Sequence, residues 1–412
     1  MRRPVCRRGR SDPVAQVQLA HGGKMIELDL DTLGMNPVYG PARRTAVCLF
    51  FDGVDITADL RKYLLSVSYT DNSDGETDDL QIRLQDRSEL WSEKWLLQAL
   101  NAASLPGSSS IRFYYDTDKK VRAETKKQED VRQSNFRMQA FIIRRNWNGE
   151  GKDEVLDCGE FFLDEITGTG APNCVTLKGS SAPYRATLRQ SPVSKHWSNI
   201  RLGDIAKYIA QKSGLQLMNL LEVDPWINVS DQNKESDSAY LSRLCRKFNV
   251  NLKFTNTAII LYSGTAKTGG TPLEISKKDI KAYDFRVGKA QREYDYCTVT
   301  YITPKGAKYS GTAYVKDFDP ERDENLHLEL NIKCSNNAEA KQLAAYQLER
   351  HNRYAVTGSI TLPGNQRIVG GVKVRLNDFG LWSGLWAVSS ANHTVDGSGG
   401  YVTKAELRKI DE

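Results

Sequence analysis

The stretch RLGDIAKYIAQKSGLQL, residues 201–217, carries apolar side chains that recur every three or four positions. Leu202, Ile205, Ala206 and Ile209 therefore fall on one face of a helix. Gly214 follows at the position where a residue in the left-handed conformation ends many helices. We predict an amphipathic helix here, with its apolar face against a core.

A second helix and a β-hairpin are predicted immediately downstream. In ESDSAYLSRLCRKFN, residues 235–249, Ser236 is a suitable N-cap and Asp237 suits the positive start of the helix. Its apolar stripe consists of Tyr240, Leu241, Leu244, Cys245 and Phe248. The runs at 249–254 and 258–262 predict the hairpin. We therefore expect residues 191–270 to form a helix–helix–hairpin module that ends in a Gly/Thr-rich linker.

The region before this module, 36–190, reads as a first β-rich domain. In DDLQIRLQDR, residues 78–87, Leu80, Ile82 and Leu84 alternate with polar residues, which is typical of a strand with one buried face. Similar strand signals occur at 47–51, 141–143 and 161–163. Asp52-Gly53 predicts a turn after the first of them.

The region after the module, 271–412, reads as a second β-rich domain with one helix. Strands are predicted at 296–303, 311–318, 356–362 and 372–376, and two final strands flank DGSGG at 396–400. Residues 336–351 form an amphipathic helix with Ala340, Leu343, Ala344 and Leu348 on one side. The fold class is therefore β-rich α+β and multidomain.

Two segments stand apart from these domains. Residues 1–35 begin with a basic stretch, and we expect them to be a disordered extension. Six basic residues against Asp12 alone give residues 1–24 a net charge of +5, so only +1 of the chain's +6 lies elsewhere. Residues 101–138 are polar, and we interpret them as an exposed insertion with one short helix or partial disorder. Nucleic-acid binding through these two segments stays an alternative.

The sequence predicts no catalytic, cofactor-binding or metal site, and therefore no enzyme. No cysteines pair as CxxC, no histidine falls at zinc-like spacing near them, and no GxSxG or phosphate-binding motif occurs. We expect the cysteines to be small buried residues in a reducing compartment, the tryptophans to anchor cores or interfaces, and the carboxylates Asp157, Glu160, Asp164 and Glu165 to be solvated. No run of about 18 apolar residues predicts a membrane span.

Several stretches resemble the late control protein D family, the baseplate hub proteins of contractile phage tails and related particles. The most specific are NIRLGDIAKYIAQKSGLQL at 199–217 and DQNKESDSAYLSRLCRKFNVNLKF at 231–254. Residues 56–96, 146–183, 356–388 and 399–410 are similar to the opening and closing strands of the family. The resemblance covers roughly 45–412 and includes no catalytic residue.

The resemblance implies a fold with two similar β-barrel domains and a structural role. Family members form a homotrimeric ring that joins the six-fold tail tube, or a tube-initiator protein, to the three-fold central spike. The implied partners also include other baseplate proteins, with DNA only in transit through the ring. The implied location is the virion or a tail-like particle, assembled in the cytoplasm of the host bacterium.

Three rival interpretations stay open beside the hub. A nucleic-acid-binding protein would use the basic extension and the insertion, and its binding would depend steeply on salt. A hub with a cryptic cell-wall hydrolase would need a further folded core, for which 101–138 is short and polar. A type VI secretion spike would carry a C-terminal β-helical needle of repeated Val-Gly pairs, which the sequence up to Glu412 lacks.

Overall fold

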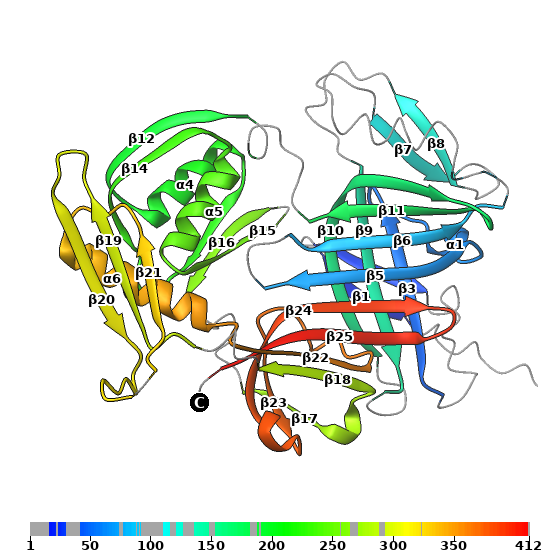
Figure 1. Cartoon of the computed structure of the whole chain (residues 1–412). Coiled ribbons are helices and arrows are strands. Elements are labelled where there is room, and N and C mark those ends of the chain that lie inside the picture. Colours follow the sequence, from blue (N-terminus) through cyan, green and yellow to red (C-terminus); the bar gives the residue numbers. More distant parts are fainter. Residues whose placement is uncertain are drawn as a thin grey trace, which may run out of the picture.

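The computed structural model contains two β-rich units that together form one sheet, and a mixed α/β lobe that lies beside it (Figure 1). It describes residues 16–21, 24–29, 42–73, 77–87, 89, 91, 110–115, 121–126, 136–147, 153–181, 188, 191–255, 257–263, 271–287, 293–322 and 324–410. Most of the Gly/Thr-rich linker predicted at the end of the module, at 264–270, lies outside these residues.

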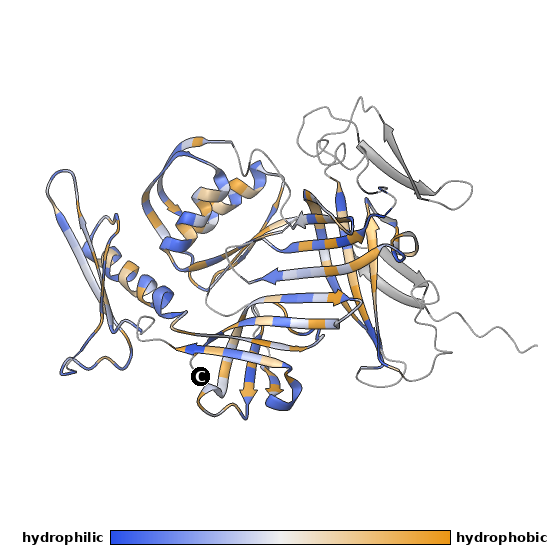
Figure 2. Ribbon diagram, turned by 45° about the vertical axis from the view of Figure 1, so that its right-hand side comes forward, coloured by the Kyte–Doolittle hydropathy of each residue, from blue (hydrophilic) through white to orange (hydrophobic). Residues whose placement is uncertain are grey.

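The first β-rich unit is an antiparallel sheet in the order β5-β6-β11-β10-β9-β3-β4. Its elements are β3 (Arg44–Phe51), β4 (Val54–Asp55), α1 (Thr57–Leu60), β5 (Leu64–Asn72), β6 (Asp79–Gln85), β9 (Arg137–Arg145), β10 (Asp153–Thr169) and β11 (Cys174–Ser180). Leu80, Ile82 and Leu84 are fully buried on one face of β6, as the alternation predicted. Figure 2 shows the same alternation of hydrophobic and hydrophilic residues along several strands.

The second β-rich unit has the strand order β18-β22-β25-β24-β23-β17. Its elements are β17 (Leu273–Ser276), η2 (Lys277–Asp279), β18 (Ala282–Val287), β22 (Val356–Pro363), β23 (Lys373–Asn377), η4 (Gly380–Trp382), β24 (Gly384–Asp396) and β25 (Gly400–Lys409). Trp386 is fully buried in its core, so the core-anchoring role expected for tryptophan is confirmed there. The turn expected at 396–400 joins β24 to β25.

The two β-rich units are joined into one 13-stranded sheet by an antiparallel ladder between β24 and β5. The N-terminal part of β24 pairs with β23, and its C-terminal part, from Ser390 to Asp396, pairs with β5. A register shift between Val388 and Ser390 in the β24–β25 ladder lies between the two parts. Such a bulge bends a strand and increases its twist, which helps β24 to serve both units.

The mixed lobe lies beside this sheet and contains the three long helices of the described chain (Figure 1). Its elements are β12 (Val193–Arg201), α4 (Leu202–Lys212), β13 (Gln216–Leu220), β14 (Trp226–Glu235), α5 (Asp237–Lys247), β15 (Val250–Phe254), β16 (Ala258–Ser263), β19 (Tyr296–Ile302), β20 (Lys308–Tyr314), β21 (His327–Asn331) and α6 (Asn337–Asn352). The predicted apolar faces of α4 and α5 are buried, and β15 and β16 form the predicted hairpin.

Ser236 and Gly214 occupy the helix-end positions that were predicted from the sequence, and α6 begins with a similar cap. Ser236 accepts a hydrogen bond from the backbone N–H of Ala239 through its hydroxyl oxygen at 3.3 Å. Asn336 caps α6 in the same way, accepting from Glu339 N at 2.8 Å. Gly214 has φ +63°, the left-handed conformation expected after α4. These contacts satisfy backbone groups that a helix terminus leaves unpaired.

The position of α6 differs from the domain division made on the sequence. We placed residues 336–351 within the second β-rich domain, 271–412. The buried residues of α6, with those of β19 and β21, instead share one core with α4 and α5. The chain thus enters the mixed lobe twice, before and after β17 and β18. A division of the chain into consecutive domains cannot describe this lobe, because its core is built from two separate stretches of the sequence.

Two hairpins occur in segments where we expected little structure. β1 (Gln16–His21) pairs with β2 (Lys24–Asp29), and β7 (Ser110–Tyr115) pairs with β8 (Val121–Lys126). These strands differ from the disorder that we expected for 16–29 and from the short helix or partial disorder that we expected for the insertion. Both sequences alternate or carry β-branched and aromatic residues that favour strands. The basic residues 1–15 and most of the insertion lie outside the described residues.

The observed class is β-rich α+β with large antiparallel sheets, as predicted. Closure of each unit into a barrel stays a prediction, because no ladder joins β3 to β5 or β17 to β18 among the described strands. Within the same residues, no helix has the length and apolarity required to cross a bilayer.

Candidate interfaces

Four of the five histidines have described side chains, which lie in separate settings, and none of these settings resembles a nucleophile–base pair. His196 contacts exposed Asp231 at 2.6 Å, and His351 Nδ1 lies 2.8 Å from the carbonyl oxygen of Gln347 in its own helix. His327 Nε2 lies 2.9 Å from the Thr298 hydroxyl, which also contacts Thr312 across the β19–β20 hairpin. The fourth, His393, is buried in the sheet and is described below.

Cysteines and carboxylates add no reactive centre within the described residues. The six described cysteines are buried and free of disulfides, as expected, whereas Cys6 lies outside. Burial raises the pKa of Cys48 and Cys158 and raises the pKa of Cys297 to about 11, so these thiols stay protonated near neutral pH. The same part of the chain holds no group of three potential metal ligands. Asp157, Asp164 and Glu165 are exposed on β10.

A buried ion cluster joins the mixed lobe to the end of β5. Lys253 on β15 donates from Nζ to Asp71 Oδ1 at 2.6 Å and to the carbonyl oxygen of Asn72 at 3.1 Å. The same Nζ lies 2.8 Å from Asp78 Oδ2. Asp71 also accepts a hydrogen bond from Gly370 N at 3.1 Å through its other oxygen, which brings in the second β-rich unit. One cluster therefore contacts all three parts of the fold.

Burial and charge act against each other in this cluster. Burial raises the pKa of Asp78 to about 6, although the nearby Lys253 ammonium opposes that shift. Burial alone would lower the pKa of Lys253, but the attraction of Asp71 and Asp78 outweighs it and raises that pKa. The lysine therefore stays charged. Loss of its side chain would leave two carboxyl groups in a poorly solvated site.

A second polar contact lies under the junction of β24 and β5. His393 is fully buried, stacks on Tyr69 of β5 at a ring-centroid distance of 5.9 Å, and lies with Nδ1 2.8 Å from the Tyr401 hydroxyl. Its Nε2 lies 2.9 Å from the carbonyl oxygen of Ile368. A neutral imidazole meets both contacts by donating from Nε2 and accepting at Nδ1. Burial lowers the pKa of His393 to about 4, which favours this neutral form.

The outer strands of the 13-stranded sheet are candidate contact edges. Among the described strands, β18 pairs only with β22, and the N-terminal part of β3 pairs only with β9. Tyr283 and Val287 of β18 are 46% and 57% exposed, which is high for large apolar side chains. Unpaired strand edges with exposed apolar groups are suited to pairing with another chain.

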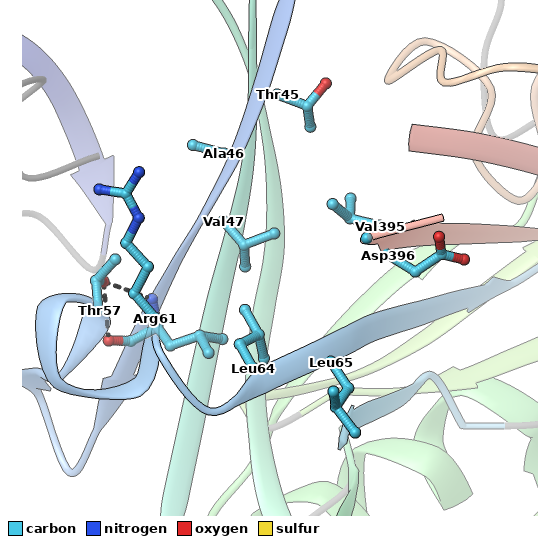
Figure 3. Close-up of a pocket in the computed structure, with 11 residues that line it drawn as sticks. Thr45, Ala46, Val47, Thr57, Arg61, Leu64, Leu65, Val395 and Asp396 are labelled. Atoms are coloured by element: carbon cyan, nitrogen blue, oxygen red, sulfur yellow. Dashed lines mark hydrogen bonds between the residues drawn. The ribbon is translucent and has the colours of Figure 1, made fainter. Parts of the chain in front are cut away.

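A small pocket lies where β3, α1 and β5 meet the β24–β25 turn (Figure 3). It has a volume of about 210 Å³ and is lined largely by aliphatic groups, including Val47, Leu64 and Val395. Thr57 forms part of its wall and is held by two hydrogen bonds to the backbone of Leu49. Arg61 and Asp396 are the charged members of this lining.

Comparison with known proteins gives relatives of one kind. The chain is 24% identical over 282 residues to the "Probable baseplate hub protein" of Escherichia phage 186, covering 67% of this chain. It is 28% identical over 203 residues to the protein of the same name from Escherichia phage P2, covering 48% of this chain. The resemblance to baseplate hub proteins is confirmed. These matches cover 60% and 40% of the relatives' own lengths, and no protein-family model matches the chain.

Solved phage tail proteins share the fold of this hub-like chain. The 43 kDa tail protein of prophage MuSo2 from Shewanella oneidensis aligns with a TM-score of 0.58 at 14% identity, covering 88% of this chain and 98% of that protein. A tail protein from Neisseria meningitidis MC58 aligns with a TM-score of 0.59 at 12% identity, covering 89% and 96%. The fold of this chain therefore recurs in these two tail proteins over 88% and 89% of its length.

Sequence reasoning on this hub-like chain identified none of the contact residues described above. Lys253 lies within NVNLKF, where its neighbours gave only a strand signal. The one signal in the sequence was a lysine among strand residues that are expected to be buried. Such a lysine indicates a nearby acidic partner, because buried charges require partners. Its partners Asp71 and Asp78 are 182 and 175 positions away, however, and no local pattern connects them with it.

Proposed function

We propose that this chain is a structural hub subunit at the tip of a contractile phage tail or tail-like particle. In this proposal three copies form a ring that joins the six-fold tail tube to the three-fold central spike. The observation that carries it is the β24–β5 ladder, which unites a seven-stranded and a six-stranded β-rich unit in one subunit. Three such subunits present six β-rich units around a three-fold axis. The six units match the six-fold symmetry of the tail tube, and the three subunits match the three-fold symmetry of the spike.

The edges of the sheet support a closed ring. A head-to-tail contact joins two different surfaces and closes into a ring when the rotation fits. The outer edges of β18 and β3 are two such surfaces at opposite ends of one sheet. Pairing them between copies would remove both exposed edges, which are otherwise an aggregation hazard.

The same proposal covers partners, location and chemistry. The partners are two further copies of the chain, the tube or a tube-initiator protein, the spike and other baseplate proteins, and DNA passes through the ring. Assembly takes place in the cytoplasm of the host bacterium, and the subunit then stays in the particle. Both curated relatives are named as probable baseplate hub proteins, which supports a structural rather than an enzymatic role.

The deciding experiment is the molar mass of the purified protein in solution, measured by light scattering with and without the spike protein of the same particle. We expect a trimer, or a monomer that becomes trimeric when the spike is added. A protein that stays monomeric under both conditions, with a cooperative thermal transition showing that it is folded, would overturn the ring.

A further inference from the structure

A wide groove lies on the mixed lobe, away from the sheet edges and from the pocket of Figure 3. It has a volume of about 800 Å³ and is bounded by β14, α5, the end of β21 and α6. Its apolar wall includes Val229, Leu244 and Ile332. A hollow of this size is within the range that accommodates a ligand or a short peptide segment.

The charged side chains that line the groove are predominantly basic. Five are basic and two are acidic, which gives the lining a net charge of +3: Arg243, Arg246, Lys247, Lys333 and Arg350 against Asp231 and Glu235. The remainder of the chain is close to neutral apart from its N-terminal segment. Because residues 25–412 sum to only +1, this basic lining contrasts with a slightly negative net charge over the other residues of that part of the chain.

Neighbouring contacts hold several of these groups in place. Arg243 donates two hydrogen bonds to Glu235, at 2.6 and 3.3 Å, and Lys333 contacts Asp231 at 3.2 Å. Both acidic groups of the lining are thus already engaged by basic ones. Arg246 and Lys333 are both exposed, and the Lys333 side chain, although it contacts Asp231, is 57% exposed and can reach an incoming group.

Carbonyl groups at the C-terminal end of α5 are already hydrogen-bonded within the groove. Gln347 of α6 is buried and donates from Nε2 to the carbonyl oxygens of Arg246 and Lys247, at 3.1 and 2.8 Å. These carbonyls would otherwise present the negative end of the helix to the groove. Because they are occupied, the lining presents cationic side chains and aliphatic groups to a ligand.

We propose that this groove binds an acidic peptide segment of a partner protein. Carboxylate side chains of the segment would contact Arg246 and Lys333, and its apolar side chains would pack on Val229 and Ile332. A peptide fits better than nucleic acid because a phosphate backbone has no apolar groups to place on the aliphatic wall.

The test uses the full-length protein and does not depend on ring formation. The probe is a short fluorescent peptide in which glutamate alternates with leucine, and binding is followed by fluorescence anisotropy. A peptide of the same length with lysine in place of glutamate and a fluorescent DNA duplex serve as competing probes. We expect the acidic peptide to bind, and its affinity to fall as salt is raised because exposed charges are screened.

Charge reversal locates the binding site. We expect Arg246→Glu combined with Lys333→Glu to weaken the acidic peptide about tenfold or more. Lys305→Glu combined with Lys308→Glu changes the net charge equally at exposed positions of the β19–β20 turn, and should leave affinity unchanged. If the glutamate pair unfolds the lobe, Arg246→Gln with Lys333→Gln provides the milder comparison.

Three results would overturn the proposal. They are no binding of the acidic peptide, binding that the groove variants leave unchanged, and DNA binding that falls in the groove variants while the peptide does not bind. The last result would assign the groove to nucleic acid. None of them bears on the trimeric ring, which the molar mass tests separately.

Discussion

Lys253 and Asp71 are 182 positions apart in the sequence, yet their Nζ and Oδ1 atoms lie 2.6 Å apart in a buried contact. This pair connects β15 of the mixed lobe to β5 of the sheet. Asp71 also accepts a hydrogen bond from Gly370. The three parts of the fold therefore share one charged cluster at their meeting point.

Replacing Lys253 should destabilise the protein strongly. Lys253→Met keeps the aliphatic stem but removes the charge, leaving Asp71 and Asp78 without their cation. Breaking a buried ion pair in this way costs about 3 kcal/mol or more of unfolding free energy. Urea denaturation followed by tryptophan fluorescence measures the change.

The control for Lys253→Met is Arg286→Met, which removes the cation of an exposed pair with Asp284 at 3.2 Å. Exposed pairs contribute about 1 kcal/mol or less, so its midpoint should change little. Equal midpoint shifts for both variants would show that the buried cluster has no special role.

Protonation of His393 should destabilise the fold in mild acid. Its pKa is about 4 in the folded protein, below the ordinary value of 6.5, so the unfolded chain binds the proton more readily. The stability that depends on the neutral imidazole is complete above pH 6.5 and is lost as pH falls towards 4. The two values correspond to about 3 kcal/mol.

Denaturation between pH 7 and 4 measures this loss, and His393→Gln separates it from other groups. Asp78 titrates in the same range with the opposite sign, because its raised pKa favours the folded state at lower pH. The difference between the wild-type and His393→Gln curves isolates the histidine. Parallel curves would exclude His393 as the source of acid sensitivity.

The sequence predicted those parts of the fold that rest on local pattern. The alternation at Leu80, Ile82 and Leu84 and the cap at Ser236 were sufficient because each depends only on residues within a few positions. By contrast, β12 was missed because its residues are mostly exposed, so Val193–Arg201 shows no apolar alternation. Strand identity there comes from pairing with β14, which is a tertiary contact.

The candidate interfaces were beyond local reasoning for a similar reason. The ladder that joins Ser390–Asp396 to β5 connects segments more than 300 positions apart, and neither segment differs from an ordinary strand in composition. The membership of α6 in the mixed lobe likewise depends on which core its apolar face meets. The helix itself was predictable from Ala340 and Leu343, but its neighbours were not.

A methyl group at Gly370 should disturb the meeting point of the three parts. A Cβ there would lie 2.8 Å from Ser73 N and 2.9 Å from the carbonyl carbon of Asn72, and backbone atoms cannot move away as a flexible side chain can. We expect Gly370→Ala to cost about 1–3 kcal/mol, as overpacking does elsewhere. Gly397→Ala is the matched control, since its Cβ would meet nothing within 4 Å. Thermal denaturation compares the two variants, and equal melting temperatures would contradict close packing at Gly370.

The exposed edge of β18 should matter more for assembly than for folding. Tyr283→Lys combined with Val287→Lys places two charges on an edge strand, and charged edges resist pairing with another chain. If β18 contacts the next copy in the ring, we expect light scattering to show a shift from trimer to monomer, whereas the melting temperature falls only by what the ring contacts of Tyr283 with Phe285 and Phe379 contribute. Ile302→Lys, a similar change at a 61% exposed residue of β19, should leave the trimer intact. A trimer that survives both lysines would place the contact between copies elsewhere on the subunit.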